Sequence, residues 1–106
     1  MPILSRDANL QTVITTFEVS PATCQELLDQ LRESYEAFVR HQSGFVGAAV
    51  HVNDARTRIA IYSQWQQRED FQAMLRAAEM RERMQRMNGL CRTFEPVMYD
   101  LTDTYG

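Results

Sequence analysis

Three side chains have types that could act on an aromatic molecule. His51 stands beside small residues, and an imidazole with an ordinary pKa of about 6.5 can accept a proton near neutral pH. Trp65 offers a flat apolar surface for stacking and an indole N–H for a carbonyl oxygen. Arg81 carries a permanent charge that could stabilise an anion. Together these groups offer a proton acceptor, a stacking surface and a cation.

Each of the three residues also has a purely structural explanation. His51 could be an exposed or hydrogen-bonded strand histidine, and Trp65 could be a core aromatic at a strand end. Arg81 belongs to a charged run that is typical of a solvated helix face. Arg83 or Arg86 could take its place, and the sequence leaves open which of the three arginines faces a pocket.

Aromatic and methionine side chains provide the candidates for substrate binding. Thioethers adapt to irregular shapes, so they suit a pocket for a large aromatic ligand. The candidates are Tyr35, Tyr62, Phe71, Met74, Met84 and Phe94, and the methionine pattern also includes Met80, Met87 and Met98. Core packing is the simpler explanation for residues at helical spacing.

Periodicity predicts the elements that would position these residues. Alternating, β-branched segments predict strands at 11–19, 45–53, 58–65 and 90–101. A spacing of 3.6 residues predicts helices at 21–40 and 66–88, the second of which could be broken into two pieces. Ser20 followed by Pro21 is a helix start in which the hydroxyl can accept a backbone N–H. Pro96 predicts that the last strand lies at a sheet edge or contains a bulge.

The order of these elements predicts an α+β fold. The order β-α-β-β-α-β is the ferredoxin-like pattern, with a four-stranded antiparallel sheet and both helices on one face. The other face is expected to carry Val46, Val50 and Val52, which are too apolar to remain in water. We therefore expect a homodimer that packs sheet face against sheet face.

Composition limits the class of protein further. The 106 residues, 44% hydrophobic and 24% charged, predict a single globular domain over 1–106 with its core at about 11–101. No apolar run reaches the roughly 20 residues of a membrane span, and no signal peptide is evident, so we expect a cytoplasmic protein without a membrane partner. A net charge of -3 without a basic block argues against nucleic acid. Cys24 and Cys91 lack the spacing of a metal site.

Three short motifs lie along the chain: Ser43-Gly44-Phe45-Val46, Tyr62-Ser63-Gln64-Trp65 and Arg68-Glu69-Asp70-Phe71. They resemble those of the antibiotic biosynthesis monooxygenase family of dimeric α/β barrels. The resemblance covers about residues 11–101 and is strongest with the small oxygenases of aromatic polyketide pathways, of the actinorhodin type. It implies the oxidation of polycyclic phenols or anthrones to quinones with dioxygen, without metal, flavin or haem.

The resemblance also assigns roles to individual residues. It implies that His51, seven positions after Gly44, is the catalytic base, and that Trp65 and Arg81 orient the substrate. Arg81 is matched through the run Ala78-Glu79-Met80-Arg81-Glu82. The chain departs from the family at two positions, with Ile61 where an asparagine is typical and Phe71 where a tyrosine is typical.

Other functions of the same fold remain as alternatives. The chain could be a non-catalytic ligand-binding or partner module, or a polyketide cyclase, and the loss of the asparagine and tyrosine favours such a role. A quinol monooxygenase would differ only in substrate size. A haem-degrading monooxygenase is less favoured, because the first strand has no asparagine and no histidine follows His51.

Overall fold

Four strands and three α-helices make up residues 9–106, the part of the chain that the computed structural model describes. Their bounds agree with the periodicity to within a few residues, and the second helical region is divided at Ala77, whose backbone is extended. The elements are β1 (Gln11–Glu18), α1 (Pro21–Ala37), the 3-10 turn η1 (Val39–His41), β2 (Phe45–Val52), β3 (Arg58–Trp65), α2 (Arg68–Arg76), α3 (Ala78–Asn88) and β4 (Thr93–Tyr99).

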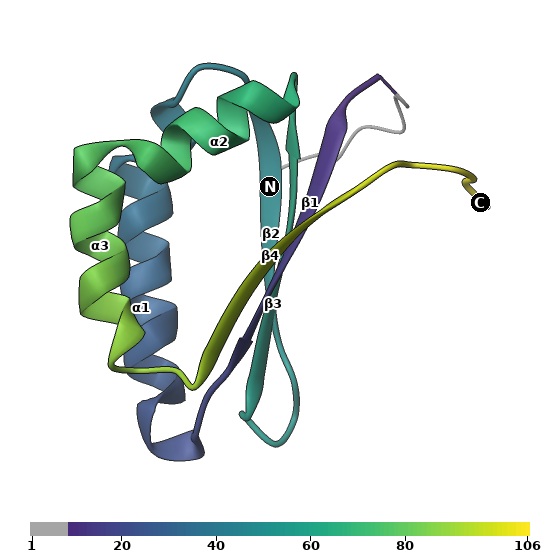
Figure 1. Ribbon diagram of the computed structural model, residues 1–106. Helices are drawn as coiled ribbons and strands as arrows, with labels where there is room; N and C mark the ends of the chain where they lie inside the picture. Colours follow the sequence, from purple (N-terminus) through teal and green to yellow (C-terminus); the bar gives the residue numbers. More distant parts are fainter. Residues whose placement is uncertain (1–8) are drawn as a thin grey trace.

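The strands form one antiparallel sheet in the order β2-β3-β1-β4. All three helices lie on one side of this sheet, and the segment after β4 runs away from the body of the molecule (Figure 1). The expected ferredoxin-like α+β fold is therefore confirmed. Pro96 lies in β4 at the sheet edge, as expected, where proline is best tolerated in a sheet.

The core lies between the sheet and α1. Every second residue of β1 and β3 points toward the helices, as the period of two requires. Buried apolar side chains from both layers meet there, and removing them from water is the main force that holds the helices to the sheet. They include Val13, Phe17, Ile59, Ile61 and Trp65 from the strands and Cys24, Leu27 and Leu31 from α1.

The prediction that Val50 and Val52 lie on the helix-free face of the sheet is wrong. Val50 pairs with Ile61 and Val52 pairs with Ile59, so both valines lie on the helix side of the sheet. The register shifts between Phe45 and Gly47, which changes the alternation around Val46. The helix-free face instead carries Ile14, Ala49, Ala60, Tyr62, Val97 and Tyr99, with Thr16, His51 and Glu95 around them.

Ser20 precedes α1 as expected, but its hydroxyl does not cap the helix. Its Oγ lies 3.2 Å from Thr23 Oγ1, while the Ser20 carbonyl accepts from the N–H groups of Thr23 and Cys24. Pro21 at the first helical position loses no hydrogen bond, because that N–H would have no partner within the helix.

Gly44 joins η1 to β2 in a backbone conformation that favours glycine. Its φ is +83°, and its carbonyl accepts from the N–H of Gln66 at 2.7 Å. The place where a side chain would begin is taken by the Asp70 side chain of α2. Gly44 thus lets α2 approach the start of β2. Among the helices of residues 9–106, none is both long enough and apolar enough to cross a membrane.

Candidate active site

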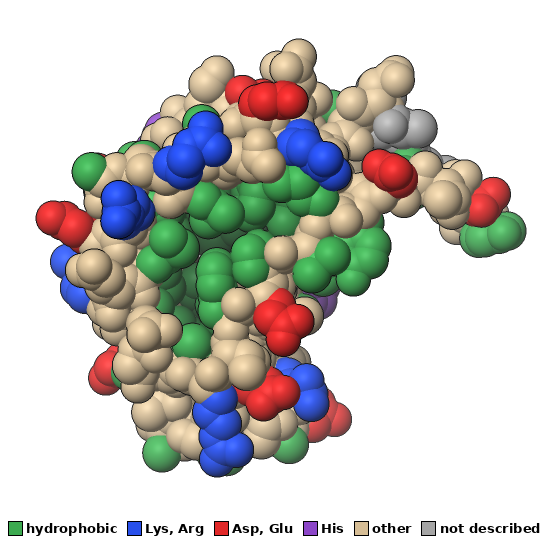
Figure 2. All heavy atoms as spheres, in the orientation of Figure 1, with side chains coloured by type: hydrophobic (Ala, Val, Ile, Leu, Met, Phe, Trp, Pro, Cys, Tyr) green, Lys and Arg blue, Asp and Glu red, His purple; other side chains and the backbone are tan. Residues whose placement is uncertain are grey.

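A cavity of about 350 Å³ lies between α3 and the β1–β4 side of the sheet. Figure 2 shows an apolar hollow between the helices and the sheet, with basic side chains over the helices at its rim. A volume of this order is at the small end of the range for small-molecule sites. The lining residues are Phe17, Arg81, Met84, Gln85, Met87, Asn88, Cys91 and Phe94.

The helical repeat explains which side of α3 lines this cavity. Arg81, Met84, Gln85 and Asn88 are spaced i, i+3, i+4 and i+7, so they form one stripe along the helix. Met80, Arg83 and Met87 form a second, buried stripe, and Met87 also reaches the cavity edge. On the other wall, Phe17 and Phe94 are paired residues of β1 and β4, with ring centroids 5.2 Å apart.

The charge of the cavity comes from Arg81. Within residues 9–106 its guanidinium takes part in no ion pair, and no carboxylate lines the cavity. Cys91 is the other ionisable lining residue; burial raises the pKa of its thiol, which donates weakly to the Met87 carbonyl at 3.7 Å. The thiol therefore remains protonated near neutral pH. An unpaired cation against apolar walls is suited to binding an aromatic anion.

His51 does not share this cavity. It pairs with Ala60 on the helix-free face, whereas Arg81 lies on the helix side of the sheet. Its side chain is exposed in the described structure. Successive residues of β2 point to opposite faces, so His51 lies across the sheet from this cavity, and its role as a base stays a prediction.

Trp65 is a core residue, which was the structural explanation left open above. Its side chain is completely buried, and Phe45 and Phe71 contact it edge-on with centroid distances of 5.3 and 5.6 Å. Its indole N–H donates to Ser63 Oγ at 3.3 Å. Phe71 and Met74 are buried in the same core. None of these three side chains presents a free surface to a ligand.

The two tyrosines lie in different places. Tyr35 lines a second cavity of about 420 Å³ beside β2, together with Phe45 and Arg40. Burial raises the pKa of Tyr35, so its hydroxyl stays protonated and is no base. Tyr62 lies on the helix-free face opposite Ile14. Neither tyrosine lines the cavity that contains Arg81.

The structure thus brings together Arg81, Met84 and Phe94 of the nine predicted site residues. Of the three candidate arginines, Arg81 lines the cavity. Arg83 contacts α1, and Arg86 is exposed on α3. The methionine pattern included Met87, but Phe17, Gln85, Asn88 and Cys91 were missed. Gln85 and Asn88 lie four and seven positions after Arg81, so a helical projection from Arg81 would have found them.

The fold and this cavity together define a class: ferredoxin-like α+β proteins with an apolar ligand site between helix and sheet. The sequence profile of one family, described as "Antibiotic biosynthesis monooxygenase", matches residues 10–86. The chain is 30% identical, over all of its own length and 94% of the relative's, to tetracenomycin-F1 monooxygenase of Streptomyces glaucescens. The chain belongs to the antibiotic biosynthesis monooxygenase family, and the resemblance noted in the sequence is confirmed.

Solved structures share the same fold. A mutant of SnoaB, described as a cofactor-independent oxygenase from Streptomyces nogalater, has a TM-score of 0.79 at 20% identity, covering 91% of this chain and 96% of its own. A putative antibiotic biosynthesis monooxygenase from Nitrosomonas europaea has a TM-score of 0.77 at 16% identity, covering 92% and 94%. At these identities the structural likeness is evidence for the fold.

Proposed function

We propose that this chain is a cofactor-independent monooxygenase that oxidises a polycyclic phenol or anthrone of an aromatic polyketide pathway to a quinone. The observation that carries the proposal is the unpaired guanidinium of Arg81 on the wall of an apolar cavity. Support comes from the names of two relatives, a tetracenomycin-F1 monooxygenase and a cofactor-independent oxygenase. Dioxygen is the co-substrate.

The proposed reaction asks little of the protein, because the substrate anion is itself the reductant. Loss of a proton from the phenol or enol gives an anion, which transfers an electron to dioxygen. Recombination of the two radicals forms a carbon–oxygen bond and a hydroperoxide. Loss of water then breaks the O–O bond and leaves the carbonyl, so that CH₂ and O₂ become C=O and H₂O. The apolar walls of the cavity limit the contact of these intermediates with water.

Arg81 is the residue that would promote the first step. A cation close to the substrate oxygen stabilises the anion relative to the neutral phenol and so lowers the substrate's pKa. Among residues 9–106, no side chain lining the cavity is a base near neutral pH, because Cys91 stays protonated. The proton therefore leaves to solvent through the open side of the cavity. Met84, Met87 and Phe94 would contact the rings of the substrate.

The absence of a base among the lining residues also favours a second candidate, a non-catalytic ligand-binding or partner module. Such a protein would need the apolar walls and the cation of the cavity but no proton acceptor. The haem-degrading alternative gains no support, since neither His41 nor His51 lines the two cavities described above and both side chains are exposed.

Oxygen uptake with a model anthrone separates these candidates. Metal-free, flavin-free protein is incubated with dithranol or emodin anthrone, and dioxygen consumption and quinone absorbance are followed against a heat-denatured control. We expect saturable uptake of one dioxygen for each quinone formed. If the anthrone binds, as seen by quenching of Trp65 fluorescence, but is oxidised no faster than in the control, the chain is a binding module.

We also propose that the chain is a homodimer through its helix-free sheet face, because apolar side chains of this extent are unfavourable in water. Val97 is 42% exposed at the β4 side of this face. Val97→Asp should give a folded monomer by sedimentation velocity, since a buried carboxylate would lack a partner. Val52→Asp is the matched control, because Val52 is 38% exposed but lies on the helix side. A dimer in both variants would contradict this interface.

A further inference from the structure

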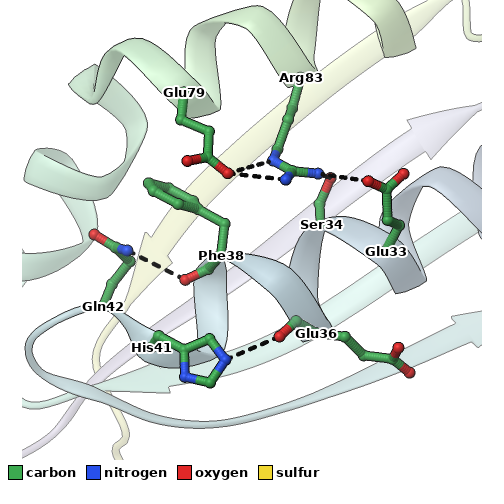
Figure 3. A network of polar contacts seen from close by, with 8 residues as sticks. All are labelled: Glu33, Ser34, Glu36, Phe38, His41, Gln42, Glu79 and Arg83. Atoms are coloured by element: carbon green, nitrogen blue, oxygen red, sulfur yellow. Dashed lines mark hydrogen bonds and ion pairs between the residues drawn. The ribbon is translucent and has the colours of Figure 1, made fainter.

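Arg83 is a buried cation that links α3 to α1 and lies outside the cavity. Its side chain is 10% exposed. Nε and Nη2 donate to Glu79 Oε2 at 3.2 and 2.8 Å, within α3. Nη1 donates to Glu33 Oε1 and to Ser34 Oγ, both at 3.4 Å, on α1 (Figure 3). The hydrogen bonds to Glu79 and Glu33 raise the pKa of Arg83, so the charge is permanent.

Two sets of contacts hold α3 in place. Met80 and Met87 pack into the core, and Arg83 reaches acceptors on α1. The cavity lies between α3 and strands β1 and β4. Arg83 follows Arg81 by two residues, which places the two side chains about 200° apart around the helix. The link from Arg83 to α1 therefore acts together with the core packing to fix the direction in which Arg81 points.

We propose that Arg83 is a positioning residue for the oxidation inferred above, and that it acts through Arg81. The planar fork of a guanidinium has fixed donor directions. Glu79 holds the guanidinium within α3, and the two acceptors on α1, Glu33 and Ser34, then restrict the rotation of α3. That rotation holds the Arg81 guanidinium at the substrate oxygen while the negative charge develops. Because this inference rests on the proposed function, its test must separate the failure of the one from the failure of the other.

The test is a double-mutant cycle between Arg83 and Arg81. Arg83→Met, measured in the unmodified chain, should lower kcat/KM for the anthrone about tenfold, mainly in kcat, because a small displacement of a catalytic group has a large cost. In a chain that already carries Arg81→Gln, the same change should alter kcat/KM by less than about twofold, because coupled residues are not additive. Arg83→Lys keeps the charge but not the planar guanidinium, so its kcat/KM should lie between that of the unmodified chain and that of Arg83→Met.

Two further variants keep the test free of folding effects. Ile59→Val removes a core methyl group from β3, away from α3, and serves as a control of lowered thermal stability. It should leave kcat/KM unchanged. Glu33→Gln keeps the size of the Arg83 partner on α1 but removes its charge, and it replaces Arg83→Met in the cycle if that protein does not fold.

The outcomes distinguish the two proposals. Equal losses from Arg83→Met with and without Arg81→Gln, or an equal loss from Ile59→Val, would overturn the positioning role. If the unmodified chain shows no turnover, the proposed function fails, and the cycle is then measured in the Kd of the anthrone by Trp65 fluorescence. Non-additive Kd values would still support the effect of Arg83 on Arg81, and additive values would overturn it.

Discussion

Replacing Arg81 by glutamine should lower kcat/KM for an anthrone about 100-fold, which is the typical cost of removing one donor to a developing oxyanion. Glutamine can still donate a hydrogen bond, but it has no charge to lower the pKa of the bound phenol. The loss should be smaller at high pH, where the substrate ionises without assistance. The measurement is the rate of quinone formation between pH 6 and about 10 in both proteins.

Arg86→Gln provides the matched control for this experiment. Arg86 is an exposed arginine of the same helix that does not line the cavity, so its replacement should leave kcat/KM unchanged. His51→Ala tests the base assignment made from the sequence. Since His51 lies across the sheet from the cavity, we expect both affinity and turnover to be retained. If either control lowers kcat/KM strongly and Arg81→Gln does not, the reaction does not take place in this cavity.

Replacing Gly44 by alanine should cost about 3 kcal/mol of unfolding free energy. A non-glycine residue in the left-handed region costs about 1–2 kcal/mol. The added Cβ would also overlap the Asp70 side chain, and overpacking of this kind costs about 1–3 kcal/mol. Both penalties apply at Gly44, whose φ is +83°. The measurement is the midpoint of urea unfolding followed by circular dichroism.

Gly89 offers the same substitution without either penalty. Its φ is -75°, in the right-handed region, and no atom lies within 4 Å of the place of a Cβ. Gly89→Ala should therefore leave the midpoint unchanged or raise it slightly, by restricting the unfolded chain. Equal midpoints for Gly44→Ala and the unmodified chain would show that Asp70 moves aside at no cost, and that the junction between η1 and β2 is not constrained.

Local patterns were sufficient to predict the elements of this fold. The alternation of Arg58–Trp65 gave the bounds of β3 without error, and Asn88 ends α3 as expected. Strand alternation places Val50 and Val52 on one face and His51 on the other, which agrees with the register. Alternation alone does not show which face of β2 the helices cover. That depends on tertiary packing, in which Leu27 of α1 shares a core with Ile59 and Ile61.

The candidate site was less accessible to sequence reasoning, because a buried side chain and a lining side chain share the same periodicity. Met74 and Met84 are both methionines of the second helical region, yet Met74 is in the core and Met84 is at the cavity. The difference follows from the break at Ala77, which gives α2 and α3 separate faces. The resemblance favoured Arg81 over Arg83, and the structure separates them by tertiary contacts: Arg81 lines the cavity, whereas Arg83 contacts Glu33 on α1.

The break at Ala77 has a consequence for the size of ligand that this chain can hold. A continuous helix from Arg68 to Asn88 would be a straight rod about 30 Å long. The longest dimension of the molecule is 38 Å, so such a rod would run along nearly its whole length. Because the chain bends at Ala77, α2 packs against β3 and α3 packs against α1. The width of the cavity therefore depends on the backbone angle at Ala77. A substitution that changes this angle would change the width without altering any lining side chain.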